Sequence, residues 1–202
     1  MWEQRAQALF LKCGDRNTSY FHSKASHKFR RNKIFWLRNS ANVWYTKDKQ
    51  TKDIVVDYFH SLFSSSHPSE HSEIFEVVKP FVTQEMNEQL LKPFTKEEVV
   101  VALNQRESIT APGPDDMPPF FYHSFWNLLG NDVSSAVLDC LNNCKIPKEI
   151  NHTNITLIPK VKSPEFITEF RPISLCNVVY KLVSKVLANR LKAVLPAVVS
   201  EN

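Results

Sequence analysis

The chain has 202 residues, of which 43% are hydrophobic and 23% are charged, so it can bury a core. Its three glycines are about 1.5% of the chain, where roughly 7% is usual, and they lie too far apart for a glycine-rich phosphate-binding loop. Twelve prolines without periodicity exclude a collagen-like chain. We expect a globular protein that does not hold phosphates through a P-loop or a dinucleotide-binding loop.

The net charge of +4 conceals a separation of charge along the chain. Residues 1–50 hold 11 basic and 3 acidic side chains, residues 51–150 hold 7 and 15, and residues 151–202 hold 7 and 3. Two basic ends therefore flank an acidic middle, a pattern that favours contact of the ends with a polyanion. The alternative is a pair of ordinary solvated surfaces.

Neither a secretory nor a membrane-spanning segment is predicted, because the longest apolar run, 99–103, is far too short to cross a bilayer. The four cysteines form no C-x-x-C pair, and we expect them to be reduced. Cys140 and Cys144 are expected one helical turn apart as small buried thiols. We therefore expect an intracellular protein of the nucleus or cytoplasm that is not secreted and does not contact a membrane.

Hydrophobic spacing and turn residues predict helices and a small hairpin in the first third of the chain. The expected elements are helices over about 2–12 and 18–32, β-prone runs at 34–37 and 43–46 around a turn at 39–42, and a helix over about 49–64.

A polar stretch at 64–72 is the expected internal boundary. Beyond it, Thr95 and Glu98 have the spacing of a helix capping box. The proline-rich residues 106–119 predict an ordered loop or an extended arm. The other expected elements are helices over about 83–91, 119–129, 132–143 and 178–195, and β-prone runs at 153–158 and 170–175.

A possible metal motif lies in the polar stretch, where His67-Pro-Ser-Glu-His71 matches the H-x-x-E-H string of some zinc proteases. Such a site needs both histidines on one face of a rigid helix. Pro68 and the preceding serines make a helix unfavourable there. We expect neither a metal site nor catalytic residues in this chain.

Two sets of cations are candidate anion-binding groups. Lys24, Lys28 and Arg31 recur at helical spacing among aromatic residues, an arrangement suited to phosphates and stacked bases. Lys160 and Arg171 lie at the end of one β-prone run and the start of the next, where both could meet one anionic group such as a triphosphate. The alternatives are a solvated helix face and ordinary surface charges.

A series of sequence blocks extends along nearly the whole chain: LKCGDRNTSYFH at 11–22, APGPD at 111–115, NHTNITLIPK at 151–160, FRPISLCNV at 170–178 and LANRLK at 187–192. In this order they resemble the reverse transcriptase of plant-type non-LTR (LINE) retrotransposons. The resemblance implies an RNA-directed DNA polymerase with an RNA template, a DNA primer and deoxynucleoside triphosphates as partners.

The resemblance also implies roles for individual residues. Lys160 and Arg171 match residues of the polymerase fingers that contact the triphosphate of the incoming nucleotide. Residues up to about 65 match an extension that holds template RNA, and its candidate contacts are Arg16, Lys24, Lys28, Arg30, Arg31 and Lys33.

Polymerisation needs two Mg²⁺ ions held by aspartates of the palm. In the resembled family these aspartates lie downstream of the position matched by residue 202, and Asp115 and Asp116 fall in the proline-rich loop instead. We therefore expect a fragment that binds no cofactor and is inactive alone, with Mg²⁺ required by the complete polymerase. The alternatives are a non-catalytic RNA-binding remnant and a relic without function.

One departure from the resembled family concerns the backbone. The family has glycine after the position of Asp115, whereas this chain has Asp116. A side chain then occupies a position where a positive φ is expected.

The expected fold is mixed α/β (α+β) and mostly helical: the truncated fingers region of a right-hand polymerase with a helical N-terminal extension and short β-hairpins. We expect exposed apolar residues on the last helix, at Leu182, Val186, Leu187 and Leu191. The expected segments are a basic helical extension at 1–65, an acidic helical connector at 66–105, and incomplete reverse transcriptase fingers with the start of the palm at 106–202.

Overall fold

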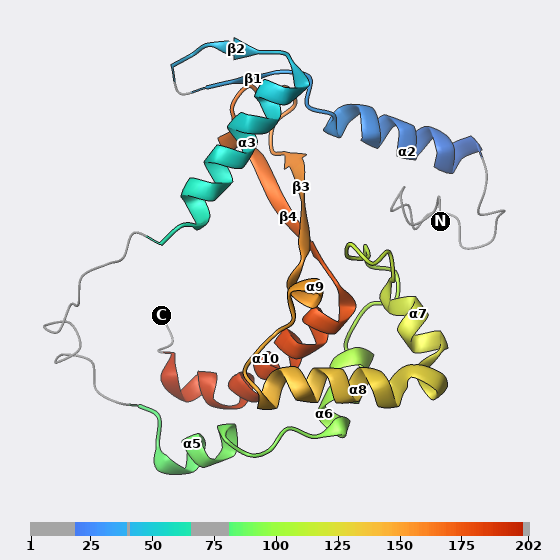
Figure 1. Cartoon of the computed structure of the whole chain (residues 1–202), viewed down its shortest axis with the longest axis vertical. Coiled ribbons are helices and arrows are strands. Elements are labelled where there is room, and N and C mark those ends of the chain that lie inside the picture. Colours follow the sequence, from blue (N-terminus) through green and yellow to red (C-terminus); the bar gives the residue numbers. More distant parts are fainter. Residues whose placement is uncertain (1–18, 40, 66–80, 200–202) are drawn as a thin grey trace, which may run out of the picture. The chain divides into compact units, whose positions relative to one another are not determined.

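The computed structural model describes residues 19–39, 41–65 and 81–199 (Figure 1). Its elements are mostly helices with two short strand pairs, which confirms the expected mixed and mostly helical class. The predicted helix over 2–12 and the H-x-x-E-H string lie outside the described residues.

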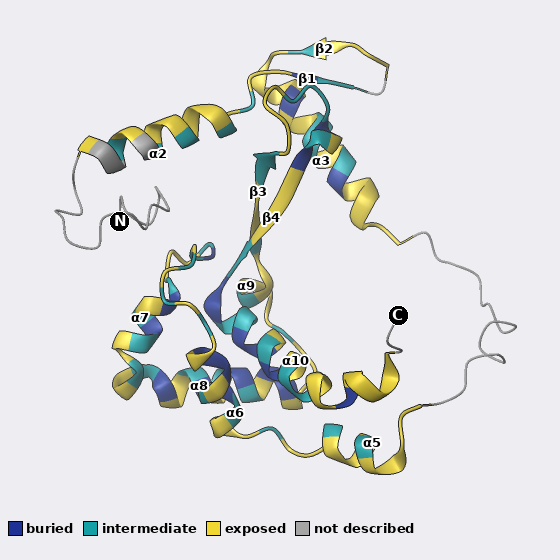
Figure 2. Ribbon diagram, turned by 180° about the vertical axis from the view of Figure 1, so that it is seen from behind, coloured by how far each residue is buried: buried dark blue, intermediate teal, exposed yellow. Residues whose placement is uncertain are grey.

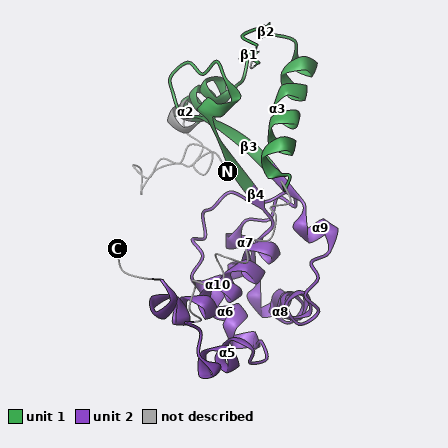
Figure 3. Cartoon of the chain, turned by 90° about the vertical axis from the view of Figure 1, so that its left-hand side faces the viewer, with its two compact units in different colours: residues 1–69, 155–174 green, residues 70–154, 175–202 purple. Residues whose placement is uncertain are grey.

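The chain divides into two compact units (Figure 3). Unit 1 comprises Met1–Ser69 and Ile155–Ser174, and unit 2 comprises Glu70–Asn154 and Leu175–Asn202. These units differ from the three consecutive segments expected from the sequence, because residues 155–174 group with the N-terminal range.

Unit 1 contains two predicted helices, α2 (Ser19–Asn32) and α3 (Asp48–Phe63). Arg30 and Arg31 occupy the last turn of α2, where the partial negative charge of the helix C-terminus favours cations. On α3, Phe59 and Thr51 are buried. The helix therefore presents one face to the core of unit 1.

The predicted hairpin between these helices is confirmed, with shorter strands than expected. Strand β1 (Leu37–Arg38) pairs antiparallel with β2 (Trp44–Tyr45). The carboxamide oxygen of Asn39 accepts hydrogen bonds from the backbone N–H groups of Ala41 and Val43, both at 3.0 Å. This Asn side chain replaces backbone bonds that a tight turn cannot make.

The second strand pair consists of β3 (Thr153–Pro159) and β4 (Phe170–Cys176). The backbone N–H of Lys160 donates to the carbonyl of Glu169 at 2.8 Å and closes the hairpin. The Glu169 carboxylate accepts from the backbone N–H groups of Glu165 at 2.7 Å and Phe166 at 3.1 Å, and these bonds lower the pKa of Glu169. The tip of the hairpin is thus an ordered turn.

The tip of this hairpin packs on β1 and α3 within unit 1. The backbone N–H of Arg38 donates to the carbonyl of Glu165 at 2.7 Å. An apolar cluster joins the three elements, and its buried members are Leu37, Phe59, Ile167 and Phe170.

Unit 2 is helical. Its core lies on the facing sides of α6, α8 and α10, which are dark blue in Figure 2. Val99 of α6, Val137 of α8 and Leu182 of α10 are fully buried there. The described helices of the unit are α5 (Gln84–Leu90), α6 (Lys96–Asn104), α7 (Pro119–Ser124), α8 (Trp126–Asn142), α9 (Lys148–Asn151) and α10 (Val178–Val198).

The predicted capping box of α6 is confirmed. The Thr95 hydroxyl accepts from the backbone N–H of Glu98 at 3.4 Å, and the Glu98 carboxylate accepts from the backbone N–H of Thr95 at 2.9 Å. Two of the N–H groups that a helix start leaves without partners are therefore satisfied.

Three sequence expectations in unit 2 are wrong. The break between α7 and α8 falls at Phe125, and the predicted break at Gly130 is absent because this glycine is buried mid-helix against the Trp126 ring. Cys144 lies beyond α8 and is exposed, whereas Cys140 is buried. On α10, Leu182 and Val186 belong to the core, so only part of the apolar surface expected there is exposed.

No helix in residues 19–39, 41–65 and 81–199 combines the length and the apolar character needed to cross a membrane.

Candidate nucleic-acid interface

The candidate template-binding cations lie mainly on and just after α2. Lys24, Lys28, Arg30 and Arg31 are α2 residues, and the last two are exposed. Lys28 and Arg31 are three residues apart in α2, a spacing that puts both on one face of the helix. Arg16 lies outside the described residues.

Lys33 follows α2 directly and is exposed. Its ammonium group lies 5.2 Å from the centroid of the Phe35 ring, a cation–π contact. Because Phe35 is exposed as well, the cation and the ring form one accessible pair.

One face of the β1–β2 hairpin carries Trp36, Arg38 and Trp44, and we call these three residues the hairpin platform. Arg38 and Trp44 are register partners, and opposed residues of an antiparallel pair share a face. Trp36 precedes Arg38 by two residues and so belongs to the same face. Leu37 points to the other face, where it is fully buried.

Contacts within the platform hold its rings. The Arg38 guanidinium lies 4.2 Å from the Trp44 ring centroid and pairs with the Glu165 carboxylate at 3.1 Å. The Trp36 and Trp44 rings meet edge to face at 6.4 Å between centroids. Both indoles remain partly open to solvent, with 47% of Trp36 and 42% of Trp44 exposed.

Lys160 and Arg171 lie near the turn that joins β3 to β4, and both are exposed. The Lys160 ammonium donates to the carbonyl of Thr168 at 2.8 Å. Arg171 follows buried Phe170 in β4, so alternation directs it away from the core. Lys160 directly follows β3, and its backbone N–H donates to the carbonyl of Glu169, which directly precedes β4.

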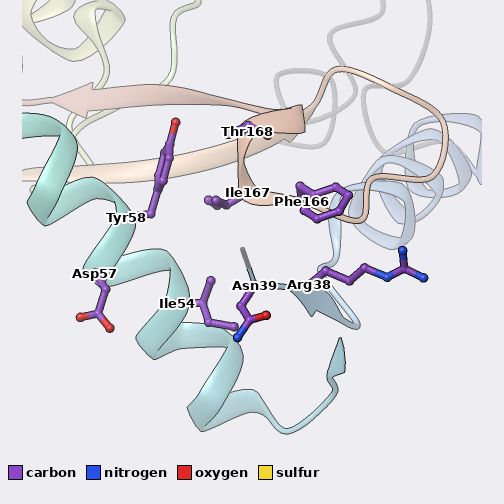
Figure 4. Close-up of a pocket in the computed structure, with 8 residues that line it drawn as sticks. All are labelled: Arg38, Asn39, Ile54, Asp57, Tyr58, Phe166, Ile167 and Thr168. Carbon is purple, nitrogen blue, oxygen red and sulfur yellow. The ribbon is translucent and has the colours of Figure 1, made fainter. Parts of the chain in front are cut away.

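A pocket of about 520 Å³ lies beside the platform in unit 1 (Figure 4). Ile54, Asp57 and Tyr58 of α3 form one wall, and Arg38 extends from the opposite side with its guanidinium directed away from Asp57. Neither histidine nor cysteine is among the eight lining residues, so the pocket offers no thiol or imidazole for nucleophilic chemistry.

In unit 2, the proline-rich loop is held by Asn177 and Lys181 from the start of α10. The Asn177 carboxamide accepts from the backbone N–H of Asp115 at 3.4 Å and donates to the carbonyl of Glu149 at 3.1 Å. The Lys181 ammonium donates to the carbonyl of Ala111 at 3.2 Å. Burial, followed by the nearby Arg106 guanidinium, lowers the pKa of Lys181.

The same loop confirms the backbone expectation for Asp116, which has φ 55°. The Asp115 carboxylate accepts from the backbone N–H of Met117 at 3.1 Å and is therefore used within the loop. In the described part of the chain, no three His, Cys, Asp or Glu side chains gather into a metal-binding group.

Sequence reasoning missed the platform and the position of Asn177 beneath the loop. The platform has a readable signal, because Trp36, Arg38 and Trp44 have the alternation of one strand face across a predicted turn. Asn177 has no comparable local signal, since its partners lie 28 and 62 residues away in sequence.

The sequence matches no protein-family model. It is 27% identical over 197 residues to a transposon TX1 uncharacterized 149 kDa protein of Xenopus laevis. The match covers 96% of this chain and 15% of that protein, so the chain spans a small part of its relative's length. The comparison supports an origin of this chain in a transposable element.

Proposed function

We propose that this chain is part of an RNA-directed DNA polymerase of a non-LTR retrotransposon. In this proposal unit 1 binds the template RNA and contacts the triphosphate of the incoming nucleotide. The order of the sequence blocks and the similarity to a transposon protein over 96% of the chain support it. The segments outside this chain would supply the palm and its metal-binding aspartates.

One structural observation carries the proposal. The hairpin tip with Lys160 and Arg171 packs on β1 and α3, so it shares a compact unit with the basic segment that follows α2. The backbone bond from Arg38 to Glu165 joins the two parts directly. A template-binding surface and a nucleotide-binding hairpin in one unit would keep a constant spacing during synthesis.

The side chains suit the proposed ligands. Arg171 presents a guanidinium fork on an exposed strand face, a geometry that matches phosphate oxygens in two-bond contacts. The Lys160 ammonium makes one hydrogen bond to a backbone carbonyl and has further protons to donate. Arg30, Arg31 and Lys33 are exposed cations close to one another in sequence, and they would form the proposed template contact.

A chimera tests the proposal. The chain is joined to the downstream polymerase segment of a related element, and extension of a DNA primer on an RNA template is measured. We expect extension that depends on this chain, because the downstream segment alone would lack the template and triphosphate contacts. A chimera that folds but extends no primer on RNA contradicts the proposal.

A non-catalytic RNA-binding remnant is the second candidate function. The exposed cations Arg30, Arg31 and Lys33, with the Phe35 ring beside Lys33, favour it. It predicts RNA binding whose affinity falls with rising salt, since phosphate contacts release bound cations. RNA binding without primer extension in the chimera would select this candidate, and a binding curve without a salt slope would indicate solvated charges.

A further inference from the structure

The hairpin platform is an unusual surface, because two indole rings are accessible on a face that also carries a guanidinium, which lies over the Trp44 ring. The opposite face of the same hairpin carries Leu37, which is fully buried. The hairpin thus has its core contacts already, and Trp36 and Trp44 are not required for them. Accessible rings of this size are usual at binding surfaces.

The residues of the platform favour a ligand that has both flat groups and charges. The Arg38 guanidinium contacts the Trp44 ring, the Glu165 carboxylate and the Asn42 carboxamide oxygen. Covering this face with an apolar protein surface would bury that ion pair at a cost. A ligand with flat groups and solvated charges can cover the two indole rings while the Arg38–Glu165 ion pair stays exposed to water.

The positive charge around the platform also favours such a ligand. Residues 19–49 contain eight Lys and Arg and one acidic residue. Lys33 adds an exposed ammonium against the Phe35 ring next to the platform in sequence. Aromatic rings interleaved with cations are the arrangement by which proteins hold unpaired bases and their phosphates.

We infer that the hairpin platform binds single-stranded RNA by stacking unpaired bases on Trp36 and Trp44, with Arg38 fixing the Trp44 ring and Lys33 contacting phosphate. This inference rests on the proposed function and deepens it, because it names bases as well as phosphates as the groups that unit 1 holds. Duplex RNA would bind less well, since its bases are already stacked on one another.

The test distinguishes binding of the bases from binding of the phosphates. A labelled short oligouridine RNA and an abasic oligonucleotide of equal length are titrated with the whole chain. The unsubstituted chain should prefer the oligouridine. The double variant Trp36→Ala/Trp44→Ala should lose roughly tenfold or more in affinity for oligouridine and little for the abasic strand, with an unchanged salt slope.

Two further variants are controls for a folding defect in the Ala double variant. Trp36→Phe/Trp44→Phe keeps flat rings and should retain most of the oligouridine preference. Phe120→Ala removes an exposed ring from unit 2 and should bind both strands as the unsubstituted chain does.

The possible results are distinct. Equal oligouridine affinity of the Ala double variant and the unsubstituted chain overturns the inference and indicates a different ligand for the platform. An equal loss on both strands also overturns it, because stacking cannot act on a strand without bases. If the unsubstituted chain binds both strands equally, the stacking role is overturned and the proposed phosphate contacts stand. If it binds neither strand at low salt, both proposals are overturned.

Discussion

Arg190 and Glu98 form a two-pronged ion pair that joins α10 to the start of α6. The guanidinium Nε donates to Oε1 at 2.7 Å, and Nη2 donates to Oε2 at 2.8 Å. The same guanidinium donates to the carbonyls of Leu90, Lys92 and Pro93 and lies 3.7 Å from the Phe94 ring centroid. Arg190 is therefore a packing residue of unit 2.

Removing the charge of Glu98 should destabilise the protein. Glu98→Gln keeps one oxygen, which can accept from Thr95 and, without its full charge, from Nη2 of Arg190. Its NH₂ group then faces the donor Nε of Arg190, so that bond is lost. We expect the free energy of unfolding to fall by roughly 1.5–3 kcal/mol, measured by urea denaturation. Glu107→Gln, on an exposed loop position, should change it little, and equal losses in the two variants would contradict the role of the pair.

The same pair predicts a pH dependence. The hydrogen bonds from Arg190 lower the pKa of Glu98 below its ordinary value of 4.5. The stabilisation is thus fully present above about pH 4.5 and is lost as the pH falls through the folded-state pKa. The stability difference between the unsubstituted chain and Glu98→Gln should shrink on acidification, and a difference that stays constant from neutral to acidic pH would be evidence against this assignment.

Gly113 should not tolerate a side chain. A Cβ atom there would lie 2.4 Å from both the backbone nitrogen and Oδ1 of Asn177. Gly113→Ala should therefore cost about 1–3 kcal/mol of stability and release the proline-rich loop. Gly130→Ala is the matched comparison, because the atoms nearest its Cβ belong to the Trp126 side chain, which can shift more easily than backbone, and alanine favours the helix. A thermal unfolding series in which Gly130→Ala is the more damaging change would refute this reasoning.

Asp116 offers a stabilising substitution. Its φ of 55° is the left-handed conformation, which costs a residue with a Cβ roughly 1–2 kcal/mol. Asp116→Gly should therefore raise the melting temperature, and Asp116→Ala should lower it because aspartate tolerates the left-handed conformation better than alanine does. Two variants that shift the melting temperature in the same direction would show that backbone conformation does not decide stability at this position.

Local sequence signals predicted many of the elements of this fold. The Thr95 and Glu98 spacing identified the start of α6, and the Asn39 turn identified the first hairpin, because both rest on contacts within a few residues. The helix break at Phe125 was missed, since glycine is a frequent helix terminator and favours a break at Gly130, whereas Gly130 lies inside α8 one turn after the Trp126 ring of the same helix.

The candidate site was predictable only in part. The Lys24, Lys28 and Arg31 spacing shows one helix face from sequence alone. The packing of the Lys160 hairpin against β1 could not be foreseen, because it depends on contacts such as Arg38 with Glu165 across more than a hundred residues. Whether these cations bind RNA and triphosphate stays a prediction.

The KM for deoxynucleoside triphosphate tests the central claim most directly. In the primer-extension chimera, Lys160→Ala and Arg171→Ala should each raise this KM, because each removes a cation from the triphosphate. Lys162→Ala, an exposed lysine of the same hairpin, should leave it unchanged. Unaltered nucleotide kinetics in Lys160→Ala and Arg171→Ala, or an equal rise in Lys162→Ala, would contradict the proposed nucleotide contact.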